Sequence, residues 1–147
     1  MTEVQSATGA DITAPQLYAV LRLRVNGFVV EQACAYPELD GRDLLTTTRH
    51  IWLPGSEDGE LAGCLRVLED ADGVLRVGRV ATSGSARGTG VGARLMEAAI
   101  GYIGDAESAL GAQTYAKGFY SRFGYAAEGE EYDEDGIQHI TMRRPAR

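Results

Sequence analysis

The stretch "SARGTGVGARLMEAA", residues 85–99, places an arginine and three glycines directly before a helical pattern. Glycine is less favourable than alanine by about 1 kcal/mol in a helix interior, so three of them at a helix start need an explanation. A glycine-rich turn from a strand into a helix N-terminus exposes free N–H groups, and the missing side chains let an anion approach. The stretch therefore predicts a phosphate-binding turn, with the guanidinium of Arg87 at its rim.

Two known phosphate-binding patterns fit this turn poorly. A P-loop is excluded because no Gly-Lys-Ser/Thr sequence follows. Gly88-x-Gly90-x-x-Ala93 matches the loose dinucleotide-binding motif. That motif expects an acidic residue about 20 positions later, at the end of the next strand. The sequence has Gly-Ala-Gln at 111–113 instead, which disfavours a nucleotide-binding oxidoreductase.

The hydrophobic periodicity predicts a mixed α/β fold on both sides of this turn. Thr13 and Gln16 form a capping-box pair before an apolar stripe of helical spacing. The strand, helix and strand between residues 74 and 113 predict a right-handed parallel unit, and the hairpin turns elsewhere predict antiparallel pairing. The expected helices cover 14–28, 90–103 and 116–124, and the expected strands 2–6, 49–54, 61–69, 74–83, 108–113, 125–132 and 137–144.

Length and composition indicate one globular domain spanning residues 1–147. The net charge of −7 argues against a nucleic-acid binder, which normally carries a basic surface. No apolar run approaches the roughly 18 residues of a membrane span, and the first residues lack the features of a secretion signal. Cys34 and Cys64 have neither metal-type nor disulfide-framework spacing, which predicts a reduced, cytoplasmic protein without a bound metal.

The sequence resembles the GNAT family of N-acetyltransferases in several ordered segments. The first is Arg87-x-x-Gly90-x-Gly92 within "GRVATSGSARGTGVGARLM" (78–96), and the second is "FYSRFGY" (119–125). Further segments are similar to the ElaA-like branch of that family. They are "FVVEQACAYPELDGRD" (28–43), Arg49-His50, "LGAQ" (110–113) and "YDEDGIQHITM" (132–142).

The resemblance implies the acyl-CoA N-acyltransferase (GNAT) fold, a central mixed and mostly antiparallel sheet flanked by helices. It also implies transfer of an acetyl group from acetyl-CoA to a primary amine, by direct attack in a ternary complex. The preceding strand is then expected to pair with the pantetheine arm, and an N–H of Ala81 or Thr82 to polarise the thioester carbonyl. The cofactor-binding residues expected on this basis are Val80, Ala81, Thr82, Arg87, Gly88, Thr89, Gly90, Val91, Gly92, Ala93, Gln113 and Phe119.

The resemblance also assigns a general acid, and the sequence context of the acidic residues suggests a general base. Tyr120 is the expected general acid for the departing thiolate, and Tyr115 is a second aromatic candidate. Glu31, in the apolar context "FVVEQ", is the first choice for the general base that deprotonates the acceptor ammonium. Asp40, Asp43 and His50 are the alternatives for this base, and they are expected near the acceptor if the loop that precedes β-strand 49–54 folds over the sheet.

A second hypothesis is a non-catalytic CoA-sensing or partner-binding module on the same fold. The acceptor is a small-molecule or peptide amine, and a homodimer is an expectation at the level of the family.

Overall fold

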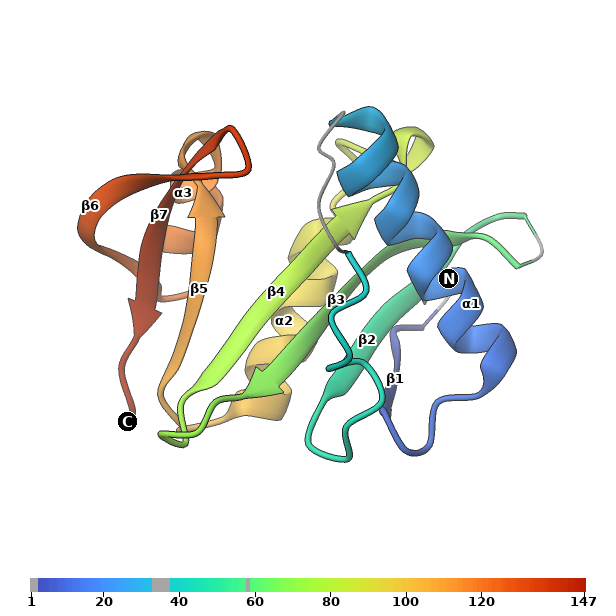
Figure 1. Cartoon of the computed structure of the whole chain (residues 1–147), viewed down its shortest axis with the longest axis horizontal. Helices are drawn as coiled ribbons and strands as arrows, with labels where there is room; N and C mark the ends of the chain where they lie inside the picture. The colour runs from blue at the N-terminus through green and yellow to red at the C-terminus, as the bar shows by residue number, and fades with distance from the viewer. Residues whose placement is uncertain (1–2, 33–37, 58) are drawn as a thin grey trace.

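The computed structural model describes residues 3–32, 38–57 and 59–147, which form a seven-stranded sheet with helices on both faces (Figure 1). The strands lie in the order β1-β2-β3-β4-β5-β7-β6. In chain order the elements are β1 (Gln5–Thr8), α1 (Ala14–Arg24), η1 (Val25–Glu31), β2 (Arg49–Pro54), β3 (Leu61–Glu69), β4 (Leu75–Thr82), η2 (Gly84–Ala86), α2 (Val91–Ile103), β5 (Ser108–Gln113), η3 (Thr114–Ala116), α3 (Lys117–Ser121), β6 (Ala126–Glu134) and β7 (Ile137–Arg144).

The pairing of the strands confirms the predicted mixed sheet. Neighbouring strands are antiparallel except β4 and β5, which are parallel and joined through α2. Helix α1 crosses one face over β3 and β4, and α2 packs on the opposite face against β2, β3 and β4 (Figure 1).

The first helix begins as predicted but ends differently. The Thr13 hydroxyl accepts from the Gln16 N–H at 3.3 Å, and the Gln16 side chain accepts from the Thr13 N–H at 3.0 Å. The expected helix over 14–28 is an α-helix only to Arg24 and then continues as the π-helical η1 to Glu31. A π-helix shifts the direction of its side chains relative to an α-helix, so η1 re-aims the residues that follow Arg24.

Other elements differ in extent from the prediction, among them β6, which covers Ala126–Glu134 and not 125–132. The first strand is displaced from 2–6 to β1, Gln5–Thr8. The expected helix over 116–124 is a short 3-10 turn, η3, followed by the single-turn helix α3. The predicted C-cap, Gly124, is wrong, because the helix ends at Ser121 with Arg122 as its C-cap, and Gly124 follows two residues later with a φ of 92°.

Two apolar clusters cover the two faces of the sheet unequally. The larger one joins α2 to the sheet through residues such as Leu95, Met96 and Leu110. The smaller one, under α1, contains Cys64 together with Val20, Trp52 and Ala81. Burial raises the pKa of the Cys64 thiol to about 12, so this thiol stays protonated at neutral pH.

The parallel strands β4 and β5 stay together over only part of their lengths. Residues 75–77 of β4 pair with residues 108–110 of β5. Beyond that point β4 runs on to Thr82 and β5 to Gln113, and the two strands diverge in Figure 1. Over the described residues, the end of β4 therefore has one edge without a neighbouring strand.

Candidate functional site

The glycine-rich turn between β4 and α2 is open on its outer side. Gly88 and Gly90 have φ values of 79° and 85°, in the left-handed region that favours glycine. A β-carbon built on either residue would meet no atom of the described residues within 4 Å, its chain neighbours aside. Gly92 differs, because its β-carbon would lie 3.3 Å from Cζ of Phe119. Two of the glycines therefore shape an accessible backbone, and the third allows close packing of α2 on α3.

The N-terminus of α2 offers N–H donors to this open turn. Gly90 is the N-cap residue, and as a glycine it has no side chain with which to cap the helix. The first intrahelical hydrogen bond runs from the Arg94 N–H to the Gly90 carbonyl at 3.1 Å. The N–H groups of the first helical turn precede that bond and lie at the positive end of the helix dipole, an arrangement suited to an anion.

The free edge of β4 leads directly into this turn. The Ser83 N–H donates to the Ala62 carbonyl of β3 at 2.9 Å. Successive N–H groups of an extended strand point to opposite edges, so the N–H of Thr82 points away from β3. That direction is the edge that β5 leaves unpaired. Of the two N–H groups expected from the sequence, the geometry therefore favours Thr82 over Ala81.

Tyr120 is connected to the glycine turn through Phe119. The two rings meet edge to face with their centroids 5.0 Å apart, and Phe119 also faces Gly92. Burial, with a smaller effect of the neighbouring Tyr115, raises the pKa of Tyr120 to about 12. Its hydroxyl therefore stays protonated at neutral pH and can donate a proton. Tyr115 is 83% exposed.

Glu31 and Arg87 form an ion pair that joins the end of η1 to the glycine turn. Both side chains are about half-exposed, at 48% and 57%. The tertiary structure thus brings the predicted general base into contact with a predicted cofactor ligand. Glu31 also lines a cavity of about 200 Å³, together with Thr82 at the end of β4 and Arg22 of α1.

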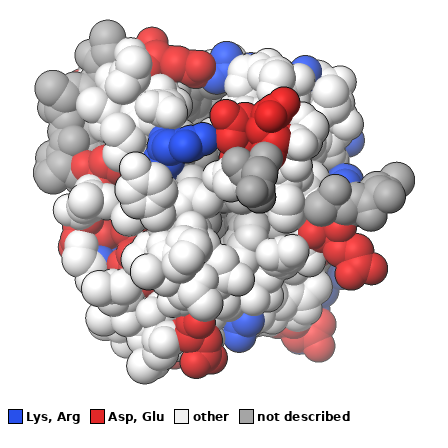
Figure 2. All heavy atoms as spheres, turned by 90° about the vertical axis from the view of Figure 1, so that its right-hand side faces the viewer, with Lys and Arg blue, Asp and Glu red and all other residues white. Residues whose placement is uncertain are grey.

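The surface around α1 carries charges of both signs. Figure 2 shows acidic and basic side chains scattered among uncharged ones on the side of the molecule that carries α1, without a continuous basic area among the described residues there. The ion pair between Arg22 and Glu60, at 3.4 Å, lies at the wall of the same cavity. This face is in keeping with the net charge of −7.

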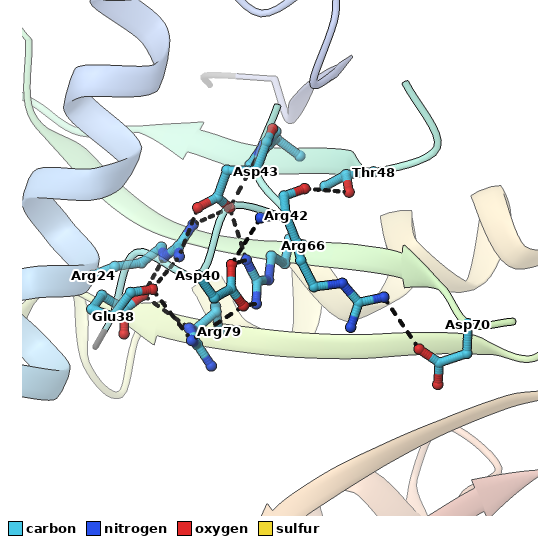
Figure 3. A network of polar contacts seen from close by, with 10 residues as sticks. Arg24, Glu38, Asp40, Arg42, Asp43, Thr48, Arg66, Asp70 and Arg79 are labelled. Carbon is cyan, nitrogen blue, oxygen red and sulfur yellow. Dashed lines mark hydrogen bonds and ion pairs between the residues drawn. The ribbon is translucent and has the colours of Figure 1, made fainter. Parts of the chain in front are cut away.

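A network of buried ion pairs lies beneath α1 and centres on Arg24 (Figure 3). Arg24 is 1% exposed, and its Nε donates to Oε2 of Glu38 at 2.6 Å. Its Nη1 and Nη2 donate to the two carboxylate oxygens of Asp43 at 2.7 and 3.2 Å. The last buried turn of α1 therefore anchors the segment 38–43 to the sheet.

Arg66 of β3 and Arg79 of β4 bind the same segment from the side of the sheet. Arg66 donates to both carboxylate oxygens of Asp40, at 3.0 and 2.5 Å, and to Asp43 at 2.9 Å. Arg79 donates to Oε2 of Glu38 at 2.9 Å. Three guanidinium groups thus face three carboxylates, and the opposite charges compensate the cost of burying them.

The network shifts the protonation of its acids. The hydrogen bonds from Arg66 hold the pKa of Asp40 well below its usual range. For Asp43, burial acts in the opposite direction, but the hydrogen bonds and charges of Arg24 and Arg66 lower its pKa overall. Burial lowers the pKa of His50, whose Nε2 donates to the Asp43 carbonyl at 2.8 Å. At neutral pH Asp40 and Asp43 are therefore ionised and His50 is neutral.

Comparison with known proteins agrees with this geometry. A family model described as an acetyltransferase (GNAT) domain matches residues 42–145, which include the free β4 edge, the glycine turn and α3. The chain belongs to the GNAT acetyltransferase family.

Three relatives of this GNAT chain cover almost its whole length. A UPF0039 protein of Mycobacterium tuberculosis is 47% identical, with 99% of this chain and 95% of the relative aligned. The crystal structure of an acyl-CoA N-acyltransferase from Pseudomonas aeruginosa has a TM-score of 0.91 at 41% identity, covering 98% and 99% of the two chains. The crystal structure of Escherichia coli ElaA has a TM-score of 0.87 at 39% identity, with the same coverage. The resemblance to the ElaA-like branch is thereby confirmed.

The GNAT fold brings most of the predicted cofactor residues to one region. Val80 and Thr82 lie on the free part of β4, the residues 87–93 form the turn and the start of α2, and Phe119 packs against that start. Gln113 ends β5, on the other side of the divergence, opposite His139 of β7.

The three residues expected near the acceptor lie together in the buried network instead of lining the cavity. His50 is fully buried, Asp43 is nearly so, and the Asp40 side chain is 28% exposed. In this structure they hold the segment 38–43 on the sheet, and their contact with an acceptor stays a prediction. Cys34 lies outside the described residues.

The sequence reasoning missed the basic half of this network. A signal was available, because Arg24 follows Val20 at helical spacing and Arg66 follows Cys64 at strand spacing, so each shares a face with a core residue. A charged residue on a core face is rarely buried unless it is paired, and such a position therefore predicts a partner.

Two further findings concern the described residues alone. They contain no group of histidine, cysteine and acidic side chains that could hold a metal ion. None of their helices is long and apolar enough to span a membrane.

Proposed function

We propose that this protein transfers an acetyl group from acetyl-CoA to a primary amine. The observation that carries the proposal is the free edge of β4, which ends in an open glycine turn at the N-terminus of α2. An unpaired strand edge suits the amide groups of a pantetheine arm, and the turn suits a pyrophosphate. The family and the P. aeruginosa acyl-CoA N-acyltransferase support an acyl-CoA as the donor.

The fit of CoA to these residues rests on the open backbone. Gly88 and Gly90 leave space where side chains would stand, and Arg87 adds positive charge beside them. We propose that the N–H groups of residues 87–93 bind the pyrophosphate and that Val80 and Thr82 pair with the pantetheine, whereas Ala81, also expected from the sequence, directs its backbone N–H to β3. Gln113 is proposed to contact the cofactor from the end of β5.

When bound, acetyl-CoA supplies an acetyl group activated as a thioester, at which an amine nitrogen replaces the sulfur. The Thr82 N–H would hydrogen-bond to the carbonyl oxygen, a kind of contact typically worth about 3 kcal/mol. Tyr120 would donate its hydroxyl proton to the departing sulfur. Glu31 would accept the proton that the acceptor ammonium loses, directly or through water.

An amine-panel assay tests this proposal. The wild-type chain is incubated with acetyl-CoA and with primary amines that include polyamines, amino sugars, amino acids and lysine peptides. We expect free CoA to be released with at least one class and an acetylated product to be found by mass spectrometry. Tight CoA binding without transfer to any amine would contradict the proposal and favour a CoA-sensing module.

We expect Gly90→Val to weaken CoA binding about tenfold or more, because a β-branched residue is strained at this φ and its side chain fills the open turn. Isothermal titration calorimetry with CoA measures the affinity. Gly73→Val is the matched control, because Gly73 has a φ of 85° and equally open surroundings in the β3–β4 hairpin. Equal losses in both variants would count against the pyrophosphate assignment.

We expect Glu31→Gln to tighten CoA binding about two- to fivefold, the scale of an exposed ion pair, because the carboxylate no longer competes with the pyrophosphate for Arg87. The same variant should lower kcat if Glu31 is the base. Glu60→Gln is the control, since it breaks the similarly exposed pair with Arg22 at the same cavity. An unchanged CoA affinity in Glu31→Gln would show that Arg87 does not exchange partners.

Three broader expectations complete the proposal. We propose a single domain over residues 1–147, a cytoplasmic location based on the cysteine usage, and a homodimer based on the family resemblance. Size-exclusion chromatography with light scattering tests the last of these.

A further inference from the structure

Strand β4 contains one residue more than its partner at Arg79. Gly78 lies opposite Arg66 of β3, whereas Ala81 lies opposite Cys64, so two residues of β4 face a single residue of β3. This is a β-bulge. Arg79 has a φ of 51°, in the left-handed region, which is unfavourable for a residue with a β-carbon.

The bulge reverses the alternation of the strand that follows it. Val80 packs against the core on the α2 side, and Ala81 faces the cluster under α1. The Ser83 N–H then points to β3, so the N–H of Thr82 points to the free edge. In a strand without the extra residue, the Ala81 N–H would point there instead. The bulge therefore selects which amide faces the proposed thioester site.

The side chain of Arg79 ties this left-handed residue to a buried segment. Its Nε donates to Oε2 of Glu38 at 2.9 Å, and its Nη2 donates to the Glu38 carbonyl at 3.3 Å. Its Nη2 also lies 3.6 Å from Oδ2 of Asp40. Glu38 is itself 4% exposed and held by Arg24 (Figure 3). The guanidinium at the bulge is thus fixed from the α1 side.

We propose that Arg79 is a positioning residue whose bonds to Glu38 hold the β4 bulge and so direct the Thr82 N–H toward the thioester carbonyl. The proposal rests on the proposed function, because it concerns the same site. It adds that the buried network under α1 contributes to catalysis through the backbone of β4.

A comparison of Arg79→Ala with Arg79→Gly separates this role from a merely structural one. Both variants remove the guanidinium and its bonds to Glu38. Only glycine adopts the left-handed conformation without strain, so only Arg79→Gly can keep the bulge without its anchor. A purely electrostatic role in the network would affect the two variants alike. Arg76→Ala is the control, since Arg76 lies on the same strand and pairs with Asp70 at 3.1 Å.

Two measurements read out the position of the amide. The first is the carbonyl chemical shift of bound acetyl-CoA labelled with carbon-13, which reports polarisation without an acceptor amine. The second is kcat. We expect the change in carbonyl chemical shift on binding to be largest in the wild type, smaller in Arg79→Gly and smallest in Arg79→Ala. We expect kcat to be about tenfold lower in Arg79→Ala than in Arg79→Gly. The CoA affinity should change little. Arg76→Ala should match the wild type.

Several results would overturn the proposal. The first is a carbonyl chemical shift in Arg79→Ala equal to that in the wild type. The second is an equal loss of kcat in folded Arg79→Ala and Arg79→Gly. The third is a carbonyl chemical shift that does not change when acetyl-CoA binds to the wild type. If Arg79→Ala fails to fold, Glu38→Gln replaces it. In that variant residue 79 keeps its β-carbon, but the charged partner of its guanidinium is lost. Failure of the proposed function looks different, because the wild type would then not bind acetyl-CoA or would transfer to no amine.

Discussion

Replacing Tyr120 by phenylalanine should lower kcat about a hundredfold or more, because general acids typically contribute 10²- to 10⁴-fold to a rate. Phenylalanine keeps the ring and its edge-to-face contact with Phe119 but removes the only proton that the side chain can donate. The CoA affinity should therefore stay close to that of the wild type. Steady-state kinetics with the best amine of the panel, together with a CoA titration, measure both quantities.

Tyr115→Phe is the control for this prediction. Tyr115 lies close enough to influence the pKa of Tyr120, but it is largely exposed and so has fewer contacts to fix its hydroxyl. We expect a small effect on kcat. A large loss in Tyr115→Phe with normal turnover in Tyr120→Phe would transfer the role of the acid to Tyr115.

Replacing Asp43 by asparagine should lower the free energy of unfolding by about 3–5 kcal/mol, the usual cost of breaking a buried ion pair on one side. Asp43 accepts hydrogen bonds from both Arg24 and Arg66, and neither guanidinium is accessible to water. An amide carries no charge to compensate them. Urea denaturation at neutral pH measures the change.

Asp70→Asn is the matched control for Asp43→Asn. Asp70 also binds two arginines, Arg42 at 3.3 Å and Arg76 at 3.1 Å, but all three side chains are partly exposed. The expected cost is therefore below about 1 kcal/mol. Equal losses in the two variants would mean that burial does not set the strength of the network.

The pH dependence of the unfolding free energy is a second test of the contribution of this network to stability. The folded-state pKa of Asp43 lies below its unfolded value, so its contribution is present above about pH 4 and is lost as the pH falls. Wild-type stability should therefore drop on acidification below about pH 4, and Asp43→Asn should show a shallower drop. A drop of equal slope in the variant would assign the acid sensitivity to other groups.

Local patterns were enough to predict most of the fold. The capping box of Thr13 and Gln16 depends on residues three positions apart, and the turn at Gly73 depends on a single hairpin. Such features are decided within a few residues, and the order of strands and helices follows from them. The π-helical end of the first helix was not predicted, because the apolar residues up to Phe28 recur at the spacing of an ordinary α-helix.

The candidate site also has a part that the sequence predicted and a part that it did not. The glycine turn and the Tyr120 segment were found in the sequence because each is contiguous and carries its chemistry in one short motif. The network of Arg24, Arg66 and Arg79 was missed, because its partners come from a helix, two strands and a loop that meet only after folding.

The sequence by itself determined the order of strands and helices along the chain and the bare backbone of the turn, because hydrophobic period and missing β-carbons are properties of the residues in place. Only the tertiary structure decided that Glu31 meets Arg87 and that Arg79 occupies a bulge. Both depend on contacts between segments distant in the chain. Strand pairing and burial fix such contacts, and no local pattern encodes them.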